Sequence, residues 1–154
     1  MQKQNLQLEH LEGKWYINMS DFPMWLRGDK TNPTFNYTVQ NIGGIICLKD
    51  EVIYLKNNKL KSIRGFDYLT DNSCLKYVWR GEGILKLLQS YWEIMFFDFT
   101  ESWAIINFQK TLFTPKGYDV ISRCKQLNSR MSENIYKKLT EMKIDSRLTI
   151  IKQE

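Results

Sequence analysis

The sequence predicts an all-β fold: an eight-stranded antiparallel up-and-down β-barrel with one C-terminal α-helix packed on its outside. Three observations lead to this prediction. The chain has 154 residues, which suits a single domain with one core. Short apolar and β-branched segments recur along most of it, separated by turn residues, and only one segment near the C-terminus has helical periodicity. Because an open meander of strands leaves unpaired edges, we expect closure into a barrel.

The strands are predicted from alternation and from the turns between them. In residues 34–40, Phe35 and Tyr37 alternate with Thr and Asn, as in a half-buried strand. Asn57-Asn58 is typical of a hairpin turn, and Lys49-Asp50 predicts a bend within the third strand. The eight predicted strands are residues 15–19, 34–40, 45–55, 59–66, 75–80, 91–97, 102–108 and 118–123.

One segment after the last strand has the spacing of an amphipathic helix. Met131, Ile135, Leu139 and Met142 recur every three or four residues, and Ser132 is the predicted N-cap. The apolar stripe of this helix needs a surface to cover, which the outside of the barrel offers. We therefore expect one domain, residues 1–154, made of a barrel at about 12–123, a helix at about 131–142 and an extended tail at about 146–152.

The charge distribution argues against a nucleic-acid partner. The 22 basic and 17 acidic side chains leave a net charge of +5, but the Lys and Arg residues are scattered rather than gathered into a stripe. We expect solvated outer faces, with at most a weak contact to an anionic membrane surface. Three cysteines are too few for a disulfide framework, and no spacing is typical of metal ligands. We therefore expect no metal and no cofactor.

The N-terminal segment as written has no apolar stretch that would indicate a signal peptide or a membrane span. The expectation is a cytoplasmic protein, or a periplasmic or secreted one if a signal peptide was removed. The sequence leaves open whether the protein is a monomer or a homodimer.

Two motifs at the ends of the predicted barrel resemble those of a known family. Gly13-Lys14-Trp15-Tyr16 resembles the Gly-x-Trp signature that opens the first strand of lipocalins, and Ser122-Arg123 is similar to the end of their last strand. The resemblance covers about residues 8–152 and is greatest to the group of bacterial outer-membrane lipocalins and apolipoprotein D. It implies that Arg123 stacks over Trp15 and closes one end of the barrel.

The sequence departs from that family in two places. The middle signature, usually Thr-Asp-Tyr, is replaced by residues 98–102, Asp-Phe-Thr-Glu-Ser. The lipoprotein signal with its lipidated cysteine is absent from the sequence as written. This second difference counts against an outer-membrane location.

Candidate ligand-binding residues are those that alternation or loop position directs into the barrel. Tyr77 and Trp79 are predicted to face inward because Lys76 and Arg80 belong in water. The sixth strand is apolar on both faces, so its inward set is open. Arg64 is a candidate for a ligand carboxylate or phosphate, with a solvent-facing Arg as the alternative. The full set is Trp25, Phe35, Tyr37, Arg64, Tyr77, Trp79, Trp92 and Phe96. The alternative for every ring is that it fills a solid core.

The resemblance implies binding, transport or storage of a small lipophilic ligand, such as a fatty acid, lysophospholipid, terpenoid or pigment. One alternative is an isomerase or cyclase that acts on a lipophilic substrate in the same cavity. Another is a membrane-maintenance or stress factor that contacts lipid surfaces, with Trp25 in its apolar loop at residues 20–33. We identify no catalytic residue, because His10 is the only histidine and precedes the first strand.

Overall fold

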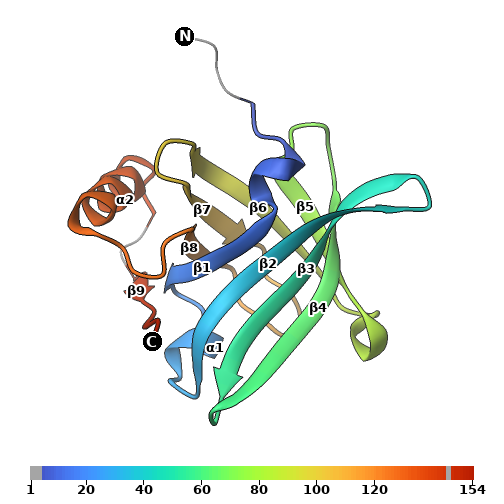
Figure 1. Ribbon diagram of the computed structural model, residues 1–154, viewed down its shortest axis with the longest axis horizontal. Coiled ribbons are helices and arrows are strands. Elements are labelled where there is room, and N and C mark those ends of the chain that lie inside the picture. Colours follow the sequence, from blue (N-terminus) through green and yellow to red (C-terminus); the bar gives the residue numbers. More distant parts are fainter. Residues whose placement is uncertain (1–4, 145–146) are drawn as a thin grey trace.

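The computed structural model describes residues 5–144 and 147–154, and its strands close into an antiparallel barrel (Figure 1). The strand order runs from β2 to β8 and then to β1, and β1 also pairs with β2, which completes the closure. The predicted fold class is therefore confirmed. The strands are β1 (Gly13–Ser20), β2 (Lys30–Ile42), β3 (Ile45–Lys56), β4 (Lys59–Leu69), β5 (Lys76–Gly81), β6 (Gln89–Asp98), β7 (Trp103–Phe108) and β8 (Gly117–Ser122).

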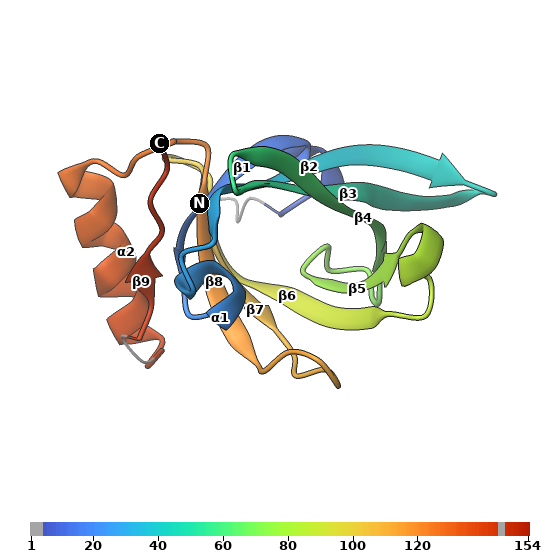
Figure 2. The ribbon, with the colours of Figure 1, turned by 90° about the horizontal axis from the view of Figure 1, so that it is seen from below.

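Short helices and one further strand complete the described elements. The 3-10 helix η1 precedes the barrel, α1 follows β1, and η2 lies between β5 and β6. Figure 2 shows the long helix α2 beside the barrel, with the two-residue strand β9 next to it. Their bounds are η1 (Leu8–Leu11), α1 (Pro23–Leu26), η2 (Gly83–Leu85), α2 (Ser129–Glu141) and β9 (Thr149–Ile150). Residue 146 of the predicted tail lies outside the described residues.

Helix α2 begins earlier than the sequence pattern predicts. The prediction of Ser132 as N-cap is wrong, because Asn128 Oδ1 accepts a 2.9 Å hydrogen bond from the backbone N–H of Met131. Asn is among the most favoured N-cap residues for this reason. The buried stripe packs, as predicted, on the outer face of the barrel. Its members and their partners are Met131, Ile135, Leu139, Met19, Trp103, Ile105 and Val120.

A β-bulge in β6 changes which of its side chains face the interior. The register with β7 shifts between Ile94 and Phe96, so one extra residue stands in β6. Trp92 and Ile94 face inward before the bulge, and Phe97 joins the interior cluster after it. Phe96 instead lies outside, 5.0 Å from the ring of Trp103 and beneath α2. The expectation that Phe96 faces a ligand is corrected by this bulge.

Strand β3 runs straight through the position where a bend was predicted. Lys49 pairs with Thr38 and Phe66, and Asp50 pairs with Tyr37 and Gly65, without a register shift. The prediction of a bend at Lys49-Asp50 is therefore wrong. Alternation along the unbroken strand turns Asp50 into the barrel, on the same face as its second neighbours.

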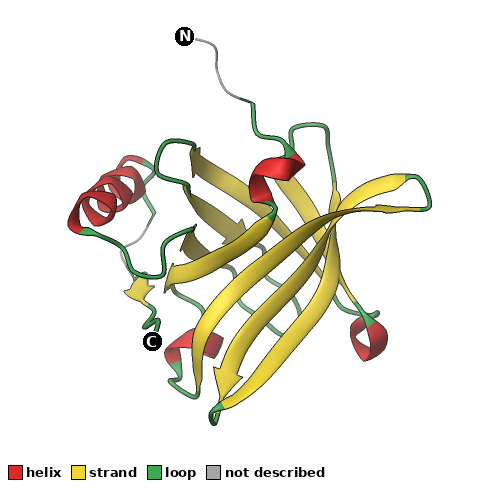
Figure 3. Cartoon of the chain, viewed as in Figure 1, coloured by secondary structure: helices red, strands yellow, loops and turns green. Residues whose placement is uncertain are grey.

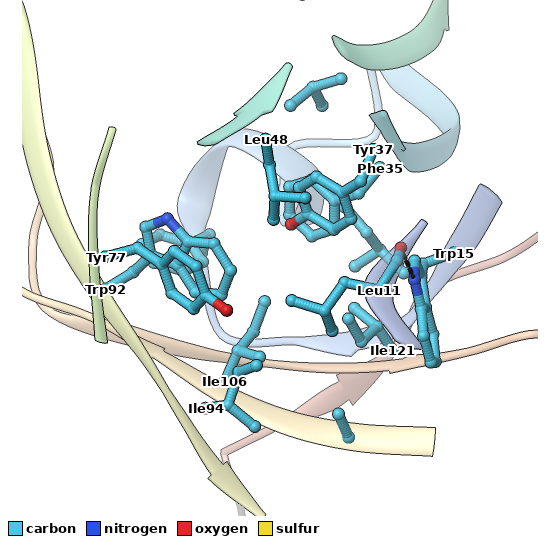
Figure 4. Packing of buried hydrophobic residues seen from close by; sticks show 14 of the residues in the cluster. Leu11, Trp15, Phe35, Tyr37, Leu48, Tyr77, Trp92, Ile94, Ile106 and Ile121 are labelled. Atoms are coloured by element: carbon cyan, nitrogen blue, oxygen red, sulfur yellow. Dashed lines mark hydrogen bonds between the residues drawn. The ribbon is translucent and has the colours of Figure 1, made fainter. Parts of the chain in front are cut away.

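One end of the barrel is sealed by the two signature residues. The Arg123 guanidinium lies 3.8 Å from the centre of the Trp15 ring and donates to the carbonyls of His10, Glu12 and Lys14. The Trp15 indole donates a 2.8 Å hydrogen bond to the carbonyl of Leu11 (Figure 4). The stacking expected from the resemblance is present in the structure.

The sealed end also explains the glycine of the first motif. Gly13 has a φ of +100°, a conformation that L side chains rarely adopt. A Cβ on Gly13 would stand 3.2 Å from an Arg123 guanidinium nitrogen. Gly13, Trp15 and Arg123 therefore act together as a structural closure of the barrel.

Candidate ligand-binding cavity

The opposite end of the barrel contains a cavity of about 430 Å³. Its lining residues come in part from α1, the segment after η2 and the β7–β8 connection. Figure 2 shows these three segments around one end of the barrel. The volume of the cavity is within the range of small-molecule binding sites. Most of the lining residues are apolar, and the aromatic wall of the cavity consists of Phe22, Trp25, Phe35, Tyr37, Trp79, Trp92 and Phe108.

The rings of this wall are held by one another. Trp92 stacks on Tyr77 with ring centres 4.4 Å apart and planes 15° from parallel (Figure 4). It also stacks on Phe108 at 6.0 Å and on Tyr37 at 6.2 Å. Offset-stacked pairs at these separations are mutually attractive. The wall is therefore a preformed surface on which an apolar or aromatic molecule can bind.

The loop after β1 covers part of the cavity. Phe22 meets Phe108 edge-on at 5.3 Å, and Trp25 of α1 meets Tyr54 at 5.6 Å. Asp21 anchors this loop, because its carboxylate accepts a 2.8 Å hydrogen bond from the backbone N–H of Tyr118. Phe22 and Trp25 are thus buried as a lid, at 8% and 6% exposure, whereas Leu26 of the same loop is 43% exposed.

Strand β4 accommodates the Trp79 indole through a missing side chain. A Cβ on Gly65 would stand 2.5 Å from two atoms of that indole and 2.5 Å from the carbonyl oxygen of Arg80. No side chain fits such a separation without movement of the backbone or the ring. Gly65 therefore makes room for Trp79 on the wall of the cavity.

Three aspartates are buried inside the barrel. Asp50 of β3 and Asp119 of β8 line the cavity, and Asp67 of β4 lies beside Asp50 on the inner face. Asp67 Oδ1 accepts a 2.7 Å hydrogen bond from the Trp92 indole. When the three carboxyls are ionised, Asp50 Oδ1, Asp67 Oδ2 and Asp119 Oδ1 have no hydrogen-bond donor among the described residues. A proton held by Asp50 forms a hydrogen bond to Asp67. A largely apolar cavity thus contains carboxyl oxygens without a donor.

Burial makes these carboxyl groups weak acids. Burial is the main cause that raises the pKa of Asp67 to about 7, while hydrogen bonds from Trp92 and Asp50 oppose it. Burial likewise raises the pKa of Asp119 to about 7, against a hydrogen bond from Ser20. Burial, and then the neighbouring Asp67, raise the pKa of Asp50 well above its usual value. Asp50 and Asp67 therefore form a pair that holds a proton at neutral pH.

The carboxyl groups also act on the phenol between them. Burial raises the pKa of Tyr37 well above its usual value, and the charges of Asp50, Asp67 and Asp119 raise it further. Tyr37 is therefore a neutral hydroxyl on the cavity wall. The four groups belong to β2, β3, β4 and β8, so only closure of the barrel brings them together.

The structure distributes the eight predicted site residues between four environments. Tyr77 is inside the barrel behind Trp92, where its hydroxyl donates a 2.7 Å hydrogen bond to the carbonyl of Cys74, and it does not line the cavity. Arg64 is exposed on the outer face and pairs with Glu51 at 3.0 Å, so it cannot meet a ligand inside. Phe96 lies beneath α2, as described above. The five that line the cavity are Trp25, Phe35, Tyr37, Trp79 and Trp92.

The sequence analysis missed the three aspartates. Tyr118 and Val120 pack on the outer face of β8, so alternation places Asp119 between them on the inner face. Asp67 lies between Phe66 and Tyr68 of β4 in the same way. A strict alternation of Leu48, Asp50 and Val52 would also have placed Asp50 inside. That signal was present, but Lys-Asp is also typical of a turn, and an acidic residue inside an apolar strand is rare.

No model of a known protein family matches this sequence, and no curated protein is significantly similar to it. Solved structures are similar. Insecticyanin from the tobacco hornworm Manduca sexta matches with a TM-score of 0.73 and 14% identity over 98% of this chain and 82% of that one. Lobster apocrustacyanin A1 has a TM-score of 0.69 and 14% identity over 95% and 79%. The siderocalin Ex-FABP, described as functioning through dual ligand specificities, has a TM-score of 0.66 and 14% identity over 94% and 95%.

These neighbours are lipocalins, and their likeness concerns the fold. The chain has the lipocalin fold: a closed eight-stranded barrel with a helix on its outside. Within the described residues, no helix has the length and apolar character needed to cross a membrane.

Proposed function

We propose that this protein is a member of the lipocalin family and that it binds a small lipophilic ligand in the barrel cavity. The observation that carries this proposal is the cavity of about 430 Å³ with its aromatic wall and its lid. An apolar molecule gains about 25 cal/mol for each Å² removed from water, and a preformed wall costs little ordering entropy. The fold of the neighbours supports the proposal, since a barrel of eight strands has room for one small ligand.

Binding of a neutral apolar fluorophore tests this function. N-phenyl-1-naphthylamine fluoresces strongly only in apolar surroundings, and we expect it to bind wild-type protein with one site per chain. Val52 lines the cavity and is paired with Phe35 of the adjacent strand β2. Val52→Trp should abolish binding of the fluorophore, because the indole ring would fill the space that the fluorophore needs. Native mass spectrometry followed by organic extraction should recover the ligand that accompanies the purified protein.

The adjacent residue provides the matched control. Ile53 follows Val52 in β3 and therefore points to the outer face, so Ile53→Trp adds the same ring outside the cavity. This variant should bind the fluorophore as wild type does. The proposal fails if folded wild-type protein shows no site, or if Val52→Trp binds the fluorophore as well as Ile53→Trp does.

A second candidate function is contact of the cavity mouth with a lipid surface. Leu87 and Leu112 are 96% exposed and Phe113 is 77% exposed, and all three border the cavity. Exposed Lys86 and Lys116 lie close to them in the sequence. Apolar loop tips beside basic side chains are suited to anionic membranes. Trp25 is buried in the lid and does not contribute to this surface.

Vesicle flotation tests the lipid contact. Wild-type protein should float with phosphatidylglycerol vesicles and not with phosphatidylcholine vesicles, and Leu112→Ser/Phe113→Ser should abolish flotation. The control is Ile45→Ser, because Ile45 is an exposed apolar residue that does not border the cavity. It lies on the β2–β3 hairpin, which Figure 1 shows far from α1. Equal flotation of the double variant and the control would contradict this contact.

A further inference from the structure

The charged groups that line the cavity are all carboxyls, beside uncharged polar side chains such as those of Gln89, Ser90 and Thr111. Asp50 and Asp119 are 5% and 1% exposed, and in the ionised form each presents a buried oxygen, Oδ1, to which no group of the described residues donates a hydrogen bond. A buried acceptor without a donor destabilises a protein, and native structures keep few of them. A ligand that donates hydrogen bonds at these oxygens would remove that cost.

The cavity also differs in charge from the rest of the molecule. The chain carries 22 Lys and Arg residues, yet within residues 5–144 and 147–154 no Lys, Arg or His lines the cavity. In the described part of the chain, none of the ion pairs involves Asp50, Asp67 or Asp119. An acidic interior inside a basic exterior is unexpected for a site that binds anions, because the charged groups that a ligand carboxylate would meet there are carboxyls.

We propose, as a refinement of the lipophilic-ligand function above, that the cavity binds a lipophilic amine. Its protonated nitrogen donates hydrogen bonds to the unpaired oxygens of Asp50 and Asp119, and its apolar part lies against the aromatic wall. An ammonium group has donors and no acceptor, so it matches this set of partners. Tyr37, Trp79 and Trp92 add the faces of electron-rich rings, which attract cations.

The same residues disfavour the other ligands of similar size. A fatty acid or a phosphate-bearing lipid carries a negative charge, and the described part of the chain offers it no basic partner in the cavity. Among the described residues, no three His, Cys, Asp or Glu side chains are close enough to hold a metal ion, so the aspartates are not arranged as a cation cage. An organic cation, whose apolar body supplies most of the affinity, remains as the ligand that uses both features of the site.

Binding of an amine to these carboxyls should depend on pH, because the groups that face Asp50 and Asp119 affect their protonation. Asp50 faces Asp67 and Tyr37, and Asp119 faces Ser20 of β1 and the nearby Asp21. Ammonium binding stabilises the ionised carboxyls, so it releases protons. We therefore expect amine affinity to fall as the pH is lowered from 8 to 5.5, while the amine itself stays protonated throughout that range.

The test compares three ligands that share one chain length. Decylamine, 1-decanol and decanoic acid are titrated against the complex of wild-type protein with N-phenyl-1-naphthylamine, and displacement is measured at pH 7.5. We expect decylamine to bind at least about tenfold more tightly than the other two. Asp50→Asn/Asp119→Asn should reduce this preference to less than about threefold, with unchanged affinity for 1-decanol.

The outer face provides the matched control. Glu51 follows Asp50 in β3 and pairs with Arg64 outside the barrel, so Glu51→Gln should keep the full preference for decylamine. The inference is overturned if wild-type protein binds 1-decanol or decanoic acid as tightly as decylamine, or if the double variant retains the preference. Either result leaves lipophilic binding intact, whereas failure of the fluorophore to bind wild-type protein defeats the proposed function itself.

Discussion

The Trp92 indole donates a 2.7 Å hydrogen bond to Asp67 Oδ1 in the interior of the barrel. Trp92 is the central ring of the aromatic stack, and Asp67 is fully buried. The hydrogen bond therefore fixes the ring that separates the cavity from the packed part of the core. It also connects the acidic and the aromatic parts of the site.

This hydrogen bond should give a measurable coupling energy. In a double-mutant cycle of Trp92→Phe and Asp67→Leu at pH 8, we expect a favourable coupling of about 1–3 kcal/mol in the free energy of unfolding, because the bond is buried and its acceptor is charged. Urea denaturation measures it. The exposed hydrogen bond between Gln89 and Tyr91 is the comparison and should give less than about 0.5 kcal/mol. Equal couplings for the two pairs would contradict the prediction.

Stability should increase on mild acidification, because the buried aspartates bind protons more tightly in the folded state. With a pKa of about 7 for Asp67 and Asp119, the folded protein retains protons that the unfolded chain releases near pH 4. The stabilisation from these bound protons is complete below the unfolded pKa. As the pH rises from there toward the folded pKa of about 7, it is lost at about 1.4 kcal/mol per pH unit for each group. Thermal unfolding should show a higher Tm at pH 5.5 than at pH 8.

Asp119→Asn isolates one of these groups. The variant should have a flatter dependence of Tm on pH, and it should be more stable than wild type at pH 8, where wild type must bury the charge. Asp71→Asn is the control, because Asp71 is exposed and hydrogen bonds from Ser73 lower its pKa. Asp71 is therefore ionised throughout pH 5.5–8, and its replacement should leave the pH dependence of Tm unchanged. A Tm that rises between pH 5.5 and pH 8 in wild type would refute the prediction.

The closure of the sealed end depends on Arg123. Arg123→Gln removes the ring contact with Trp15 and the donors to three carbonyls, so we expect a loss of about 2–4 kcal/mol in the free energy of unfolding. Arg80→Gln, an exposed position on β5, should change it by less than about 0.5 kcal/mol. Urea unfolding compares them, and the role assigned to Arg123 is wrong if both variants lose the same amount.

The start of α2 can be tested with two single alanine substitutions. Asn128→Ala removes the acceptor for the Met131 N–H and should lower the free energy of unfolding by about 1 kcal/mol. Ser132→Ala lies inside the helix and should have little effect or stabilise it slightly. The opposite order of the two effects, measured by chemical denaturation, would restore Ser132 as the N-cap.

Local pattern was sufficient for the architecture of this protein. Turn residues and alternation predicted the eight strands in their order, and the apolar stripe from Met131 to Met142 predicted the outer helix. The resemblance of two short motifs to those of lipocalins implied the contact of Arg123 with Trp15. Each of these features depends on residues that are close in sequence or on a motif with a fixed place in the chain. The direction of Tyr37 and Trp79 followed from the same alternation.

The content of the site was decided by tertiary structure. The extra residue near Ile94 turned Phe96 to the outside, and alternation alone does not reveal a bulge because the register belongs to two strands at once. Asp50, Asp67 and Asp119 are far apart in the sequence and each is unremarkable there, but closure places them against the same Tyr37 phenol. Their raised pKa values come from burial, which depends on the whole barrel. The sequence by itself determined the barrel, its outer helix and much of its aromatic wall, whereas only the tertiary structure brought the buried carboxyls together, because burial and strand closure involve the whole chain.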